Sequence, residues 1–144
     1  MRSDRKKSLL RSALLGGGIC VTLIGIMHIF MPAMGYENTI PLSMPGEVSN
    51  HFYYLGTYAI CTFLLTLGFL SIYASRIHHP DVSFVICSAF SLLWISRTVL
   101  EIIYPVRLKL FFLSVPTVVL LPLIILIAAV YTGGSVSYIL SRNK

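Results

Sequence analysis

The chain has 144 residues, of which 56% are hydrophobic and 11% are charged. Soluble globular domains carry about 25% charged residues, and the mean hydropathy here is +0.85. These values exclude an ordinary soluble domain and predict an integral membrane protein. The net charge is +6, but five basic residues lie within the first eleven positions: Arg2, Arg5, Lys6, Lys7 and Arg11. Such a cluster before an apolar run is typical of a membrane anchor, so we exclude nucleic acid as a partner.

Four apolar runs follow this basic segment. An α-helix rises about 1.5 Å per residue, so roughly 20 residues cross a hydrocarbon core of about 30 Å. The runs lack the alternation of barrel strands, and a lipid-exposed backbone must satisfy its own hydrogen bonds. The sequence therefore predicts an all-α, integral membrane four-helix bundle. Residues 1–144 form a single domain with spans at about 12–33, 52–74, 82–103 and 111–132.

The basic residues predict the orientation of the four spans. Eight Lys or Arg lie on the side that holds both termini, namely the five above with Arg76, Arg142 and Lys144. The connections on the opposite side hold only Arg107 and Lys109. Cytoplasmic segments carry the excess of Lys and Arg, so we expect both termini in the cytoplasm.

The polar side chains of the spans are predicted to gather in the outer half of the membrane. His28 would lie about 24 Å above the inner side, and Arg97 and Glu101 about 22 Å and 28 Å above it. The second span begins on the outer side, close to His51 and Tyr54. The inner half of each span is expected to be almost purely apolar.

Spacing predicts which way these side chains face. Trp94, Arg97, Glu101 and Tyr104 follow one another at intervals of three, four and three, which places them on one helix face. Arg97 and Glu101 are also four apart and can pair. On the first span, His28 shares a side with Gly18 and Gly25, and glycines mark close helix contacts in membranes. We therefore expect both faces to point inward.

Three interpretations of these residues remain open, and the last of them is that Glu101 simply reaches interfacial water. In the first, Arg97 and Glu101 form a structural pair, and His28 bridges two helices by a hydrogen bond. In the second, the polar residues line a pocket open to the outside that binds a lipid or a small anionic or amphipathic ligand. The residues of this pocket would be His28, His51, Tyr54, Trp94, Arg97, Glu101 and Tyr104.

Catalytic chemistry finds little support in the sequence. No G-x-S-x-G motif, carboxylate dyad or metal-ligand spacing such as H-x₃-H is present, so we assign no catalytic and no metal-binding residue. The three cysteines, one in each of three apolar runs, are expected to be packing residues.

The leading prediction is a non-enzymatic accessory or ligand-binding membrane protein. The alternatives are a redox-associated enzyme subunit with quinone or haem as cofactor, and a subunit of an oligomeric transporter. Expected partners are membrane lipids and other membrane subunits or further copies of the chain.

Three segments resemble a group of small bacterial inner-membrane proteins that have four helices and no assigned activity. They are "GIMHIFMP" with His28 and Pro32, the start of the second span near Asn50, and "LLWISRTVLEIIY" with Trp94, Arg97 and Glu101. In that group the acid follows the arginine by three positions, whereas here it follows by four. The resemblance implies the four-helix topology, a location in the inner membrane of a bacterium and the choice of site residues. It implies no reaction, cofactor or substrate.

Overall fold

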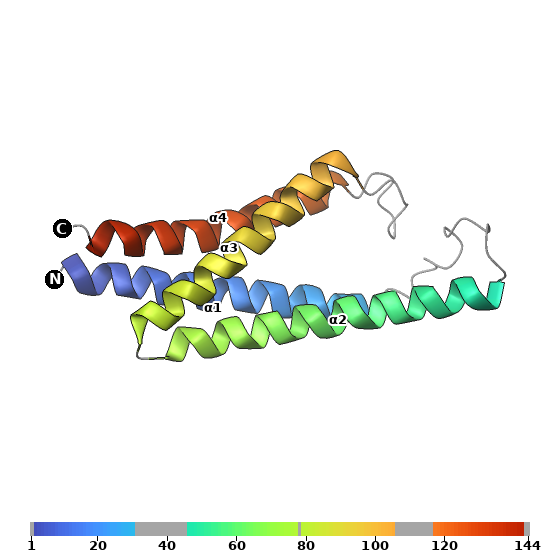
Figure 1. Ribbon diagram of the computed structural model, residues 1–144, viewed down its shortest axis with the longest axis horizontal. Helices are drawn as coiled ribbons and strands as arrows, with labels where there is room; N and C mark the ends of the chain where they lie inside the picture. Colours follow the sequence, from blue (N-terminus) through green and yellow to red (C-terminus); the bar gives the residue numbers. More distant parts are fainter. Residues whose placement is uncertain (1, 31–45, 78, 106–116, 143–144) are drawn as a thin grey trace.

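The computed structural model describes residues 2–30, 46–77, 79–105 and 117–142, and these form four helices (Figure 1). The helices are α1 (Arg2–Ile29), α2 (Gly46–Arg76), α3 (Pro80–Ile103) and α4 (Thr117–Arg142). Each contains a stretch long and apolar enough to cross a membrane: Ser8–Ile29, Tyr54–Arg76, Pro80–Ile103 and Val118–Leu140. The prediction of an all-α membrane protein with four spans is confirmed.

The end of the fourth span was predicted too early. The expected span, 111–132, ended before Gly133 and Gly134, whereas α4 continues through both glycines to Arg142. Residues 111–116 lie outside the described residues. A Cβ atom added to Gly134 would lie 2.7 Å from the Cβ of Ala13 on α1. Gly134 therefore serves helix packing and does not end the helix, because a small residue inside a span lets two backbones approach closely.

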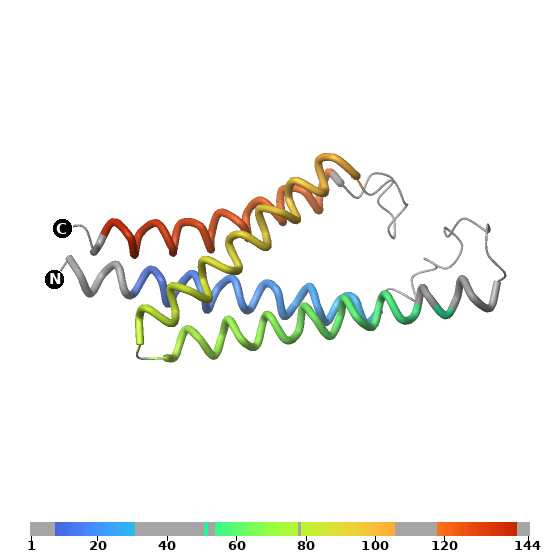
Figure 2. Tube along the Cα trace, in the orientation of Figure 1, coloured from blue at the N-terminus to red at the C-terminus, as the bar shows by residue number. Residues whose placement is uncertain are grey.

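The helices are arranged so that α1 has two packing partners. It packs against α2 on one side and against α4 on the other, and α3 packs mainly on α4. Figures 1 and 2 show α3 running obliquely, from the end of α2 to the start of α4. The start of α1, the end of α4 and the connection between α2 and α3 lie together, and we call this the termini end. The opposite end, where α1 and α3 finish, is the far end.

Consecutive glycines let α1 approach both neighbours. A Cβ atom on Gly18 would lie 2.9 Å from the carbonyl oxygen of Gly68 on α2, and one on Gly17 would lie 2.5 Å from the ring of Tyr131 on α4. Lipid offers no hydrophobic driving force between spans, so close packing of small residues holds such helices together. A Cβ atom on Gly25 would likewise lie 3.1 Å from Leu65. The prediction that Gly18 and Gly25 mark a contact face is confirmed.

A buried hydroxyl network joins α1, α2 and α4 towards the termini end. Ser71 Oγ donates to the Leu14 carbonyl oxygen at 2.7 Å and lies 2.9 Å from the Tyr131 hydroxyl. The one proton of Ser71 is used on Leu14, so Tyr131 is the donor to Ser71. Both Ser71 and Tyr131 are completely buried. Three helices are thus cross-linked by two side chains that carry no charge.

A second set of polar contacts joins α3 to α4. Ser91 Oγ lies 2.6 Å from Thr132 Oγ1, and Ser88 Oγ donates to Ser135 Oγ at 3.3 Å. At the termini end the Tyr138 hydroxyl donates to Asp81 at 2.9 Å. The prediction of an almost purely apolar half on this side is therefore wrong. Short hydroxyls lower hydropathy little, and their hydrogen bonds are completed only by the neighbouring helix.

Candidate functional site

The candidate site begins with the buried face of α3. Its members include Ser83, Cys87, Phe90, Trp94 and Glu101, which recur at intervals of three, four and seven residues. This spacing is the repeat of one helix face. Trp94 is 5% exposed and Glu101 is 1% exposed. Glu101 therefore continues the core face of α3 towards the far end, as the sequence predicted for both residues.

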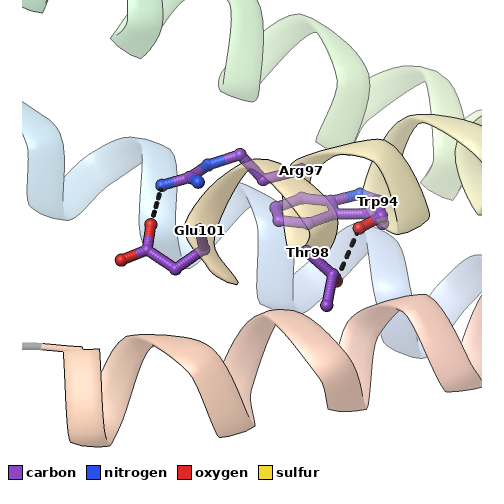
Figure 3. A network of polar contacts seen from close by, with 4 residues as sticks. All are labelled: Trp94, Arg97, Thr98 and Glu101. Atoms are coloured by element: carbon purple, nitrogen blue, oxygen red, sulfur yellow. Dashed lines mark hydrogen bonds and ion pairs between the residues drawn. The ribbon is translucent and has the colours of Figure 1, made fainter. Parts of the chain in front are cut away.

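Arg97 pairs with the buried carboxylate of Glu101. Arg97 Nη2 lies 2.6 Å from Glu101 Oε2, which confirms the pair expected from their spacing. Figure 3 shows the guanidinium leaving α3 on the side turned away from α4 and reaching over the carboxylate. The Arg97 side chain is 41% exposed, whereas that of Glu101 is 1% exposed. The pair thus has a buried acid and an accessible base.

The accessible base lies close to the far end of its helix. Arg97 precedes the last residue of α3, Ile103, by six positions, which corresponds to about 9 Å along the helix axis. An arginine at this depth can extend its head towards the membrane surface while its stem stays in the apolar layer. A guanidinium also has five N–H donors, which exceeds what one carboxylate oxygen accepts. Arg97 can therefore hold Glu101 and a second acceptor at the same time.

Thr98 is a member of this group that the sequence did not single out. Its Oγ1 donates to the Trp94 carbonyl oxygen at 2.8 Å (Figure 3), and the residue is half-buried. A hydroxyl bonded to the carbonyl four residues earlier is held in one rotamer and often bends a helix slightly. The four-residue interval from Trp94 was the only signal in the sequence that could have pointed to it.

His28 is placed on α1 and is half-buried. Its Nδ1 lies 2.8 Å from the carbonyl oxygen of Ile24, four residues earlier on the same helix. The structural interpretation expected His28 to bridge two helices, but this nitrogen bonds within its own helix. The bond fixes the ring orientation and leaves Nε2 as the atom of His28 with which a ligand could interact.

Tyr104 does not continue the inward face of α3, so that prediction is wrong. The helix ends at Ile103, and Tyr104 caps it with φ −124° and ψ 71°, its N–H donating to Leu100 at 2.8 Å. Outside the helix the repeat of three and four residues no longer sets its direction, and its side chain is 76% exposed. His51 and Tyr54 are exposed on α2. A ligand-binding role for these three residues stays a prediction.

The described part of the chain contains no cluster of metal-ligand side chains. Within those residues, no three His, Cys, Asp or Glu side chains are close enough together to hold a metal ion. Cys61 and Cys87 are buried and reduced, and their sulfurs point to carbonyl oxygens of Gly25 and Tyr131 at 3.4 and 3.3 Å. Both thiols act as weak donors between helices, which agrees with their expected role in packing.

Comparison with protein-family models, with curated proteins and with solved structures finds no match to this chain. The four-helix membrane architecture implied by the resemblance is present. The family itself stays a prediction. The class that fold and site define is a polytopic membrane protein with four candidate spans and an ion pair within the third.

Proposed function

We propose that this chain is a non-enzymatic accessory or ligand-binding membrane protein whose site at the far end binds a lipid or a small anionic or amphipathic ligand. The observation that carries the proposal is the asymmetry of the ion pair, in which Glu101 is 1% exposed and Arg97 is 41% exposed. The buried acid fixes the arginine in place, and the arginine presents its remaining donors to a ligand.

The energetics of a charged pair in a span support a role beyond packing. An arginine at the centre of a span costs about 2.5–3.5 kcal/mol on insertion scales. Replacing a buried ion pair by apolar residues of similar volume is often neutral or stabilising. An ion pair that served only stability would thus offer the helix no advantage over apolar residues. Guanidinium is well suited to carboxylate or phosphate, because it can bind two oxygens in parallel.

The other residues of the site have distinct proposed roles. Trp94, being buried, supports the backbone one turn before Arg97 and does not reach the ligand. His28 offers Nε2 from α1, because its Nδ1 is held by Ile24. His51, Tyr54 and Tyr104 are exposed and are proposed to contact a ligand only at the membrane surface.

We further propose that the termini end faces the cytoplasm of a bacterium and that the protein lies in the inner membrane. The support is the unequal distribution of basic residues in the sequence, eight against two in the segments outside the spans. Labelling of single cysteines placed in 34–45 and near residue 78 in intact cells tests this orientation. Labelling of the second position by an impermeant reagent would overturn it.

The ligand-binding proposal is tested on the purified full chain with single-chain anions as probes. Dodecyl phosphate and dodecanoate should raise the melting temperature more than the neutral dodecyl maltoside added at the same concentration. Arg97→Gln should strongly reduce this difference, and Arg97→Lys should retain part of what Arg97 contributes, because ammonium cannot bind two oxygens in parallel. His28→Ala should fold normally and bind the anions more weakly.

Three outcomes would overturn the proposal. Equal stabilisation by anionic and neutral amphiphiles in the unmodified protein would remove the anion site. Failure of His28→Ala to fold would assign His28 to structure. A Soret band in the purified protein, or quinone in its organic extract, would instead favour the redox-associated enzyme subunit.

A further inference from the structure

The whole net charge of the protein lies at the termini end. The net charge is +6. Eight basic and two acidic residues belong to the sequence segments that flank this end: Arg2, Asp4, Arg5, Lys6, Lys7, Arg11, Arg76, Asp81, Arg142 and Lys144. The rest of the chain has three basic and three acidic residues and is therefore neutral: Glu37, Glu47, Arg97, Glu101, Arg107 and Lys109. The sequence therefore assigns the whole net charge to the segments next to this end.

Helix α1 continues from its apolar stretch into the basic segment at residues 2–7. The helix begins at Arg2, whereas the candidate span begins at Ser8. The six intervening helical residues extend about 9 Å beyond the span, and the polar headgroup layer of a leaflet is about 5–8 Å thick. The basic residues of this segment are therefore placed at the depth of lipid phosphates by a continuous helix.

The helix macrodipole explains some of these charges but not those of α1. Arg76 and Arg142 are the last residues of α2 and α4, where the dipole favours a cation. The start of a helix favours an anion, yet the first two turns of α1 hold four basic residues and one acid. The basic residues are therefore unfavourable for the start of α1 itself. Such a departure from the usual charge preference of a helix start is expected where a binding partner compensates for it.

The described side chains at this end are accessible to such a partner. Arg11, Arg76 and His79 are exposed. Asp81, one of the two acids, accepts the Tyr138 hydroxyl at 2.9 Å and so is directed at α4. Exposed arginines from α1 and from the end of α2 therefore lie at one end of the bundle (Figure 1).

We propose that the termini end binds the headgroups of anionic phospholipids in the adjacent leaflet in preference to zwitterionic ones. The recognised chemistry is a lipid phosphate with net negative charge, held by Lys and Arg at headgroup depth. Each basic residue close to an anionic membrane surface contributes roughly a fivefold gain in association. This surface is separate from the ion pair at the far end and does not depend on the function proposed for that site.

The test measures lipid retention by the purified full chain. The protein is equilibrated in mixed micelles with phosphatidylglycerol and phosphatidylcholine of identical acyl chains, and retained lipid is counted by native mass spectrometry. We expect retention of the anionic lipid to exceed that of the zwitterionic one by about tenfold or more, from two or more basic contacts. Replacing Arg2, Arg5, Lys6 and Lys7 by Gln should lower this ratio severalfold, and adding Arg97→Gln removes the preference that belongs to the far-end site.

Matched variants separate this surface from other charges. Arg107→Gln with Lys109→Gln removes two charges in the connection between the third and fourth spans, and the preference should survive. It should also survive Arg97→Gln, which distinguishes it from binding at the far-end site. Should the fourfold variant not fold, a salt series on the unmodified protein replaces it. Raising NaCl from about 0.05 M to about 1 M must remove the preference, because the Debye screening length falls to about 3 Å.

Three results would overturn the proposal. They are equal retention of the two lipids by the unmodified protein, an unchanged ratio in the folded fourfold variant, and a ratio unaffected by salt. Displacement of phosphatidylglycerol by polyglutamate at equal charge concentration would also overturn it, since the surface would then fit an acidic protein better than a lipid.

Discussion

The two ends of the described bundle use polar residues in opposite ways. Towards the termini end, Ser71 and Tyr131 are uncharged, and their hydroxyls bond between helices, as do those of Ser88 and Ser135. Towards the far end, Arg97 and Glu101 pair within a single helix. The first arrangement holds helices together, whereas the second places charge inside one helix and contributes little to the contact between helices.

This difference shows that the depth of a polar residue in the membrane does not determine its role. Helical rise placed the charged residues correctly at one end because a charge is visible in any hydropathy profile. The same profile treated Ser71 and Tyr131 as members of an apolar segment. Their importance depends on the approach of α1 through Gly17 and Gly18, which no single-helix pattern contains.

The largest expected effect comes from forcing α1 and α2 apart. In Gly68→Ala the new Cβ would lie 2.8 Å from the backbone nitrogen of Thr22 and 3.0 Å from the Gly18 carbonyl oxygen. Backbone must then move, and the Ser71–Leu14 bond one turn away should break. We expect a loss of about 3 kcal/mol in unfolding free energy, measured by denaturation in detergent.

Gly56→Ala is the matched control for this substitution. It lies on the same helix, and a Cβ atom there would meet nothing within 4 Å. Its stability should be unchanged or higher by up to about 1 kcal/mol, because alanine has the higher helix propensity. Similar losses for both variants would mean that glycine acts through α2 itself and not through its contact with α1.

The next effect tests the ion pair at the far end. Glu101→Gln keeps the shape of the side chain but removes the carboxylate that lies 2.6 Å from Arg97. Breaking a fully buried pair costs about 3–5 kcal/mol. Arg97 is 41% exposed, so we expect a smaller loss of about 2 kcal/mol. The loss is measured by thermal unfolding in lipid nanodiscs.

A double variant sharpens this measurement. Adding Arg97→Gln to Glu101→Gln removes the charge left without its carboxylate, so part of the lost stability should return. A melting temperature that does not change in Glu101→Gln would show that Arg97 reaches water or another acceptor. A double variant less stable than either single one would contradict the pairing described here.

The sequence predicted the elements of this fold far better than their contacts. Four spans follow from length and hydropathy, and the pairing of Arg97 with Glu101 follows from a local spacing. Tyr104 was misplaced because spacing has no meaning beyond the last helical residue. The end of α4 was misplaced because a minimum span length of about 20 residues does not show where a helix stops, and α4 continues through Gly133 and Gly134.

The candidate site was predictable only as a set of residues on one helix. Whether His28 faces Arg97 depends on how α1 and α3 cross, and nothing within either helix sets that angle. Its bond to Ile24 is a property of its own helix, and the sequence interpretation overlooked it in favour of a bridge. Single-domain organisation over 1–144 likewise stays a prediction.

A smaller effect is expected from the hydroxyl network. Ser71→Ala removes the donor to Leu14 and the acceptor of Tyr131, whose ring remains completely buried. Hydrogen bonds between spans average about 0.6 kcal/mol, so the loss of two should cost about 1 kcal/mol. Tyr131→Phe should cost about half as much, because Ser71 keeps its bond to Leu14. Chemical denaturation in detergent measures both, and equal losses would exclude this order of donation.

The smallest effect concerns the contact between α3 and α4. Ser91→Ala removes a hydroxyl that lies 2.6 Å from Thr132 Oγ1, while Thr132 keeps its 2.7 Å bond to the Ala128 carbonyl oxygen. The remaining hydroxyl is therefore still satisfied, and the loss should be about 0.6 kcal/mol or less. Ser96→Ala is the control, since Ser96 is exposed and bonds only its own helix at Leu93 among the contacts described. A larger loss at Ser96 than at Ser91 would show that hydroxyls stabilise α3 from within, and the contrast between the two ends would then lose its basis.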